Sequence, residues 1–201
     1  MGETEALTRM TDPLAPAPPP APTPGSSGAT GLVYADVPNR AIAYIIDSII
    51  VFIAILVVGI VLAGVGLATS TVSTGLVIET NYVATIIVGL IGIAISGAYF
   101  VYTWTSMRAT IGMRILGMQI GNAGDGTTLT MEQAIRRFAA LSAPSVVAQV
   151  FQPVPGIGLL LSLLALAWVI YLLYTTANSP TKQGWHDKFA NTQVVKAAKS
   201  V

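Results

Sequence analysis

The stretch NRAIAYIID, residues 39–47, sets the organisation of the chain because it places two charges at the start of a long apolar run. Arg40 stands where water meets the first hydrophobic segment, and Asp47 follows about two helical turns later on nearly the same face. At about 1.5 Å per residue, the carboxylate lies about 10 Å inside a bilayer. A charge at that depth raises the free energy of insertion by about 2.5–3.5 kcal/mol. Asp47 therefore needs a partner, water or a proton.

Composition identifies an integral membrane protein. The 201 residues are 53% hydrophobic and only 9% charged, whereas a soluble domain has about 25% charged residues. The mean hydropathy of +0.71 agrees. The chain has no cysteine, which excludes disulfides and thiolate metal centres. With one histidine and scattered acidic residues, we expect no metal and no cofactor. We also expect no binding of nucleic acid and, because no nucleophile–base pair or cofactor loop is found, no enzyme activity.

Hydropathy predicts three membrane spans, at residues 41–68, 82–105 and 157–176, and the distribution of charge argues for a fourth membrane segment at residues 134–152. The segment at 134–152 is short and contains Pro144, so it either crosses or re-enters the membrane. All ten Lys and Arg residues lie in the N-terminal region, the 106–137 loop or the C-terminal tail, and none lies in the 69–81 loop or the 153–156 turn. Because cytoplasmic loops are enriched in Lys and Arg, we expect a multi-pass protein of the cell membrane with both termini cytoplasmic.

Residues 1–38 hold eight of the twelve prolines and form the first of two expected regions. Such a segment buries too little apolar surface to offset its ordering entropy, so we interpret it as a disordered Pro-rich tail. It is either a solvated tail or a ligand for a Pro-binding or envelope partner. Residues 39–200 form the transmembrane domain, with Asn39 expected to cap the first span. The fold class is an all-α membrane protein, a small bundle of about four transmembrane or re-entrant helices.

The 106–130 loop and the C-terminal tail predict a small cytoplasmic cap. The loop suggests a helix up to Gly112 and a short strand from Arg114 to Ile120. Thr130 followed by Gln133 is the pattern of a capping box that begins the next helix. The residues TQVV, 192–195, suggest a second short strand. We expect the two strands to pair and to hold Asp187 near the 106–137 loop.

Three passages together resemble the RDD family of bacterial membrane proteins, over about residues 34–196. They are Arg40 and Asp47 in the first span, the loop RATIGMRILGMQI with Arg136 and Arg137 downstream, and the tail HDKFANTQVV with Asp187. The family is named for one arginine and two aspartates, and Arg40, Asp47 and Asp187 stand where those residues belong. The resemblance implies transport, including sodium–proton exchange in some members.

The loop departs from the family pattern at two positions. The family usually has Thr-Pro-Gly-Lys there, whereas this chain has Ile111 in place of the proline and Met113 in place of the lysine. A role that depends on that lysine is therefore not carried over to this chain.

Five residues are candidates for an ion or charge network: Arg40, Asp47, Asp187, Arg136 and Arg137. Asp47 either locks helix packing through an arginine or binds a proton or cation in a transport cycle, and we expect it inside the bundle near one of the three arginines. Asp187 fits a cytoplasmic salt bridge better than a conduction role. The arginines also suit anchors that reach toward lipid headgroups. We expect His186 to be a hydrogen-bonding neighbour of Asp187 rather than a metal ligand.

Two classes of function remain open. The first is a component of small-solute or cation (Na⁺/H⁺) transport, acting as an oligomer because four spans enclose little pathway. The second is a non-transporting assembly or accessory protein of the envelope, which uses the Pro-rich tail and the bundle surface for partners. The expected partners are the lipid bilayer and further copies of the chain or other membrane proteins.

Overall fold

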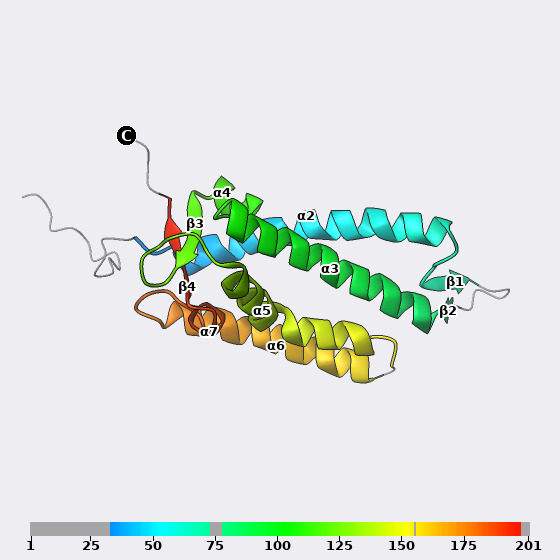
Figure 1. Ribbon diagram of the computed structural model, residues 1–201. Coiled ribbons are helices and arrows are strands. Elements are labelled where there is room, and N and C mark those ends of the chain that lie inside the picture. The colour runs from blue at the N-terminus through cyan, green and yellow to red at the C-terminus, as the bar shows by residue number, and fades with distance from the viewer. Residues whose placement is uncertain (1–32, 73–77, 155, 198–201) are drawn as a thin grey trace, which may run out of the picture.

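Four long helices form a bundle that is closed at one end by a small cap (Figure 1). The computed structural model describes residues 33–72, 78–154 and 156–197. The long helices are α2 (Val37–Gly64), α3 (Tyr82–Ser106), α5 (Met131–Phe151) and α6 (Ile157–Ala177). The cap contains α4 (Ile111–Ile115), α7 (Trp185–Phe189), β3 (Met118–Asn122) and β4 (Thr192–Lys196). A short hairpin of β1 (Ser70–Val72) and β2 (Ile78–Thr80) lies at the other end.

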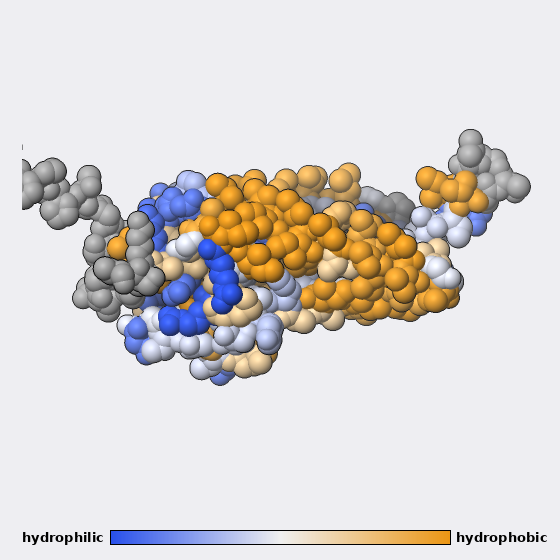
Figure 2. Space-filling model, turned by 90° about the horizontal axis from the view of Figure 1, so that it is seen from above, coloured by the Kyte–Doolittle hydropathy of each residue, from blue (hydrophilic) through white to orange (hydrophobic). Residues whose placement is uncertain are grey.

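Three of the long helices, α2, α3 and α6, are long and apolar enough to cross a membrane. Their apolar side chains cover much of the visible surface of the bundle, whereas hydrophilic residues gather at the cap end (Figure 2). The fourth helix, α5, is less apolar and packs between α3 and α6, with Pro144 inside it. These features confirm the predicted all-α membrane bundle. Residues 1–32 of the expected Pro-rich tail lie outside the described residues.

The predicted strand pairing in the cap is confirmed. β3 and β4 pair antiparallel, with Gln119 opposite Val195 and Gly121 opposite Gln193. The strand begins later than predicted, because the residues from Ile111 to Ile115 form α4 and Gly117 turns the chain at φ +64°. Residues 33–36, which we had assigned to the tail, lead into α2 beside β4: Ala35 N donates to Val194 O at 3.1 Å.

Helix ends follow local hydrogen bonding. The predicted capping box at α5 is confirmed, since Thr130 Oγ1 accepts from Gln133 N and the Gln133 side chain accepts from Thr130 N. The predicted cap at Asn39 is wrong. Pro38 is tolerated in the first turn of α2, so the helix already begins at Val37 and Asp36 takes the N-cap position. Asn39 Nδ2 instead donates to Asp36 Oδ1.

The buried core lies where the helix ends meet the cap, not along the whole bundle. Its fully buried members include Met118 and Ile120 of β3, Val194 of β4 and Ala134 of α5. The core extends into the membrane helices through Ala43 and Val51 of α2 and Phe100 and Trp104 of α3. Away from the cap, the three candidate spans bury little of their surface against one another. The cap is therefore the part of the molecule in which side chains are held most firmly.

Candidate functional site

Asp187 lies at the centre of a buried ion-pair network between the membrane helices and the cap. Its side chain is 0% exposed and pairs with Arg40 of α2 and Arg137 of α5. Arg40 Nη1 lies 2.9 Å from Asp187 Oδ2, and Arg137 Nη1 donates to Asp187 Oδ1. The backbone N–H of Gly184 adds a donor at 3.0 Å. One carboxylate therefore ties α2, α5 and α7 together.

Both arginines also bond to the cap. Arg40 Nη2 donates to the carbonyl of Val194 in β4 at 3.1 Å, and Arg40 Nε donates to Ala35 O at 3.2 Å. Arg137 Nη1 donates to Thr192 Oγ1 at 2.6 Å. The guanidinium of Arg137 also lies 5.2 Å from the centre of the Trp104 ring, a cation–π distance. Removing either arginine would therefore loosen the contact between bundle and cap.

The charges in this network favour an ionised Asp187. Burial alone raises the pKa of Asp187, but the interactions with Arg137, His186 and Arg40 together outweigh burial and hold that pKa well below its usual range. Two guanidinium groups then face one carboxylate, which leaves one positive charge in a buried setting. A buried ion of this kind is stable only where its geometry and hydrogen bonds are good.

His186 lies beside the network without a hydrogen bond to it. Its Nε2 is 3.6 Å from Asp187 Oδ2, too long for the expected bond. Burial lowers the pKa of His186 to about 4; Asp187 opposes this shift, while Arg137 and Arg40 add to it. The imidazole is therefore neutral at pH 7. Among the described residues, no cluster of three or more His, Cys, Asp or Glu could hold a metal ion.

Asp47 forms a second buried site with a different composition. Its carboxylate, 2% exposed, accepts from the Tyr99 hydroxyl at 2.7 Å, the Thr110 hydroxyl at 2.5 Å and Gly112 N at 2.8 Å. Tyr99 belongs to α3, and the other two donors belong to the start of α4. A Cβ at position 112 would collide with the carbonyl oxygen of Ala43, so a glycine is needed for α4 to approach α2 this closely. Asp47 thus fixes α4 against α2 and α3.

The expectation of an arginine partner for Asp47 is wrong within the described chain. Asp47 lies inside the bundle, but its three partners are two hydroxyls and an amide, and none of its contacts is an ion pair. Arg40 and Arg137 pair with Asp187 instead. Arg136 points to the exposed face of α5, where its Nη2 lies 2.5 Å from Glu132 Oε1. The structure therefore joins three of the five candidates and leaves Asp47 and Arg136 in separate surroundings.

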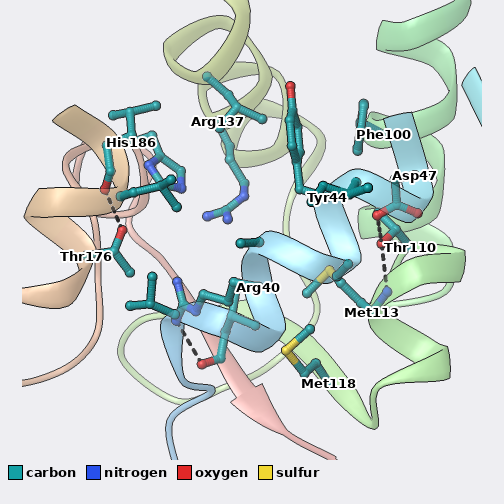
Figure 3. Close-up of a pocket in the computed structure, with 18 of the residues that line it drawn as sticks. Arg40, Tyr44, Asp47, Phe100, Thr110, Met113, Met118, Arg137, Thr176 and His186 are labelled. Carbon is teal, nitrogen blue, oxygen red and sulfur yellow. Dashed lines mark hydrogen bonds between the residues drawn. The ribbon is translucent and has the colours of Figure 1, made fainter. Parts of the chain in front are cut away.

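A cavity of about 390 Å³, here called the cap cavity, lies next to both aspartate sites (Figure 3). Arg40, Arg137, His186 and Asp47 line it. In Figure 3 Arg137 points from α5 toward Arg40, with Tyr44 on one side and His186 on the other. The remaining lining is mostly apolar. It comes from α2, α5 and α6, with further side chains from α3, α4 and the two cap strands: Val37, Ala41, Ile45, Phe100, Trp104, Met113, Met118, Leu141, Val169, Leu172, Leu173 and Val194.

A second cavity of about 630 Å³, the far cavity, lies between α2, α3 and α5 and extends to the β1–β2 end. Its polar lining is uncharged: Ser48, Thr69, Ser70, Thr80, Thr85, Ser96, Ser142, Ser145 and Gln149. Tyr44, Phe100 and Leu141 line both cavities. The rings of Tyr44 and Phe100 stack with centroids 6.3 Å apart. These three side chains therefore form a narrow apolar barrier between two cavities that extend to opposite ends of the bundle.

Several residues of these sites are not predicted by the sequence pattern. Thr110 and Gly112 belong to the loop motif, but no local pattern places them beside Asp47. Thr192 was assigned only to a strand. Phe100 is one of several aromatic residues near the end of the second span. Its position between small residues at Ser96 and Thr103 would have been the available hint of an inward-facing ring.

The fold, the membrane helices and the placement of Arg40 and both aspartates define a small multi-helix membrane protein with a charged cap. The model of the RDD family matches residues 34–191, so the chain belongs to the RDD family. No curated protein and no solved structure matches the chain.

Proposed function

We propose that this RDD family protein is a component of small-solute transport, with a path along the bundle through the cap cavity and the far cavity. The observation that carries the proposal is the pair of cavities, which extend to opposite ends of the bundle and share the barrier of Tyr44, Phe100 and Leu141. A transporter needs access from each side and a closed point between them. A barrier of three side chains is thin enough to open through small helix movements.

The orientation follows from charge. Arg40, Arg136, Arg137 and the basic residues of α4 and the C-terminal tail gather at the cap end, whereas Glu79 is the charged residue described at the hairpin end. We therefore place the cap and both termini in the cytoplasm and the β1–β2 hairpin outside a cell membrane. Because the chain lacks cysteine, single cysteines at Asn122 and Thr71 test this directly. Labelling of position 122 from outside intact cells would overturn the orientation.

Cation exchange is the narrower version of the proposal. The carboxylate suited to bind a cation or proton along this path is Asp47, which lines the cap cavity. Its oxygens accept from three donors, so a cation must displace Tyr99 or Thr110 before it binds. The uncharged lining of the far cavity suits a small polar solute without that displacement. We therefore place small-solute transport first.

Flux into proteoliposomes tests the proposal. The panel includes Na⁺, K⁺, Li⁺, protons and small polar solutes. Ser96 lines the far cavity, so Ser96→Phe should reduce flux of the transported species severalfold, whereas Leu90→Phe on the lipid-facing side of α3 should not. Phe100→Ala should raise flux by joining the two cavities, with Phe189→Ala in the cap as its control. Absence of flux for the whole panel, including in Phe100→Ala, would favour the accessory or assembly role instead.

A further inference from the structure

One edge of the Arg137 guanidinium has no acceptor in the described chain. The side chain is 8% exposed, and its hydrogen bonds to Asp187 and Thr192 both come from Nη1. Its Nε is buried and has no hydrogen-bond partner among the described residues. Arginine binds phosphate and carboxylate groups through two parallel N–H donors, and the edge formed by Nε and Nη2 supplies such a pair. A buried donor without an acceptor is unfavourable by about 1–3 kcal/mol.

A second buried nitrogen of the cavity lining, on His186, also lacks a hydrogen-bond partner. His186 Nδ1 has no partner in the part of the chain that the structure describes, and His186 lines the cap cavity together with Arg137. Arg40 differs from both, because each of its three guanidine nitrogens donates to a described acceptor. Within the described chain the buried side-chain nitrogens without a partner are these two and Arg108 Nε, and of the three only Arg137 and His186 line the cap cavity.

Charge determines what this side of the cavity attracts. Arg40 and Arg137 share the single carboxylate of Asp187, so this group of three side chains carries a net positive charge. Asp47 is the acidic residue that lines the cavity; it keeps its negative charge, but its oxygens are turned toward donors of α3 and α4 rather than toward Arg137. An anion at Arg137 would compensate the positive charge and satisfy the free edge at once.

The walls of the cavity suit an acyl chain. One wall is formed by aliphatic side chains of α2 and α6, such as Ile45, Val169 and Leu173, and the rest of the uncharged lining is mostly aromatic or apolar. Arg40 lies in the first turn of α2 and Arg137 in the second turn of α5, so both cations stand near the cap end of the bundle. Phosphate groups of a bilayer lie at the ends of its spanning helices, with acyl chains extending from there along the apolar surface.

We propose that the cap cavity binds one anionic phospholipid, with its phosphate on the Nε–Nη2 edge of Arg137 and an acyl chain along α2 and α6. The volume of about 390 Å³ is in the range of small-molecule sites and accommodates part of such a chain. His186 supplies a further hydrogen bond to the phosphate when Nδ1 carries its proton. The site does not require transport, and lipid binding is measured separately from flux.

Native mass spectrometry of the purified full chain, titrated with phosphatidylglycerol or phosphatidylcholine, tests the proposal. We expect one phosphatidylglycerol to be retained at concentrations at which phosphatidylcholine is not. Arg137→Lys keeps the charge but loses the two-donor edge, and should weaken retention by about tenfold or more. Arg136→Lys, one residue away on the exposed face, should leave retention unchanged. Equal retention of both lipids, or equal loss in both variants, would overturn the proposal.

A second pair of variants decides the matter if Arg137→Lys does not fold. Leu173→Trp fills the apolar wall and should abolish retention, whereas Leu166→Trp on the exposed side of α6 should not. Thermal unfolding with inorganic phosphate tests separately whether the anion alone binds. If phosphate protects the chain against heat as well as phosphatidylglycerol does, or if Leu173→Trp retains the lipid, the cavity does not bind a phospholipid and the proposal fails.

Discussion

Asp187 and Asp47 are both buried carboxylates at the cap end of the bundle, but they are compensated in opposite ways. Asp187 is held by two arginines and a backbone amide. Asp47 is held by a tyrosine hydroxyl, a threonine hydroxyl and a backbone amide, without a cation. Asp187 stands in the cap, where side chains from several elements converge. Asp47 stands inside α2, where the start of α4 brings neutral donors to it.

Because the two carboxylates are compensated differently, the free energy of unfolding should respond differently to changes around each of them. A charge neutralised by charge leaves a large penalty when one partner is removed, because the remaining ions stay buried. A charge held by neutral dipoles loses hydrogen bonds one at a time, each worth about 1.5–3 kcal/mol when the acceptor is charged. The Asp187 site should therefore be sensitive to charge and pH, and the Asp47 site to local geometry.

The largest effect is expected for Asp187→Asn. It leaves Arg40 and Arg137 buried without a counterion, so we expect a loss of about 3–5 kcal/mol in the free energy of unfolding. Unfolding in detergent micelles, followed by circular dichroism, measures it. Glu132→Gln, which breaks the exposed pair with Arg136, is the control and should change stability by less than about 1 kcal/mol. Similar losses in the two variants would show that burial of Asp187 does not matter.

The next effect is a pH dependence at the same site. Unfolded His186 binds a proton near its ordinary pKa of 6.5, whereas burial lowers the pKa of the folded residue to about 4. Between these values the unfolded state binds more protons, so stability should fall as the pH falls from 6.5 to 4, by about 3 kcal/mol in total. Above pH 6.5 this contribution is constant. His186→Gln should remove the slope in thermal unfolding measured over this range.

The titration of Asp187 falls outside the pH range of that measurement. Because its pKa lies well below the usual range, its contribution to stability is lost only at pH values below about 4. A slope between pH 6.5 and 4 that persists in His186→Gln would show that another group titrates there, and that His186 is not the pH-sensitive part of the charged site.

A smaller effect is expected for Asp47→Asn. The amide keeps one acceptor oxygen but places an NH₂ group against a donor, so we expect a loss of about 2–3 kcal/mol. The double variant Asp47→Asn with Arg137→Lys tests whether the two sites are independent. Because Asp47 and Arg137 share no hydrogen-bond partner, the two losses should add within about 0.5 kcal/mol. If the double variant were more stable than the sum of the two losses predicts, Asp47 and Arg137 would interact directly, as the sequence suggested.

The sequence predicted the long helices, the α5 capping box and the pairing of the two cap strands, because hydropathy, capping residues and β-branched runs are local signals. The family resemblance also identified Arg40 and Asp187 as members of one candidate charge network. It did not distinguish Arg136 from Arg137, although neighbouring residues on a helix point about 100° apart and only one faces the bundle. That choice depends on how α5 packs against α3 and α6, which no local pattern states.

The surroundings of Asp47 could not be predicted for a related reason. The sequence shows where a charge enters the membrane, and the nearest cations are then the natural candidates for its partner. Two of the three actual donors are the Thr110 hydroxyl and the amide of Gly112, which reach Asp47 because the chain folds back as α4. A backbone N–H is present at nearly every residue, so its selection as a partner leaves no mark in composition or spacing.

The smallest effect tests whether the close approach of α4 maintains the Asp47 site. A Cβ at position 112 would meet the carbonyl of Ala43 and lie 3.0 Å from Asp47 Oδ2, so Gly112→Ala must push α4 away from α2. We expect a loss of about 1–3 kcal/mol in the free energy of unfolding, as for other overpacked sites.

Gly59→Ala in the same helix bundle is the matched control, because nothing lies within 4 Å of a Cβ there. This control should stabilise α2 slightly, by about 0.5–1 kcal/mol, since alanine favours helix more than glycine does. Thermal unfolding of the two variants side by side gives the comparison. If Gly112→Ala were as stable as Gly59→Ala, α4 would be free to move from Asp47, and the carboxylate would be open to the cap cavity as the cation-exchange version of transport requires.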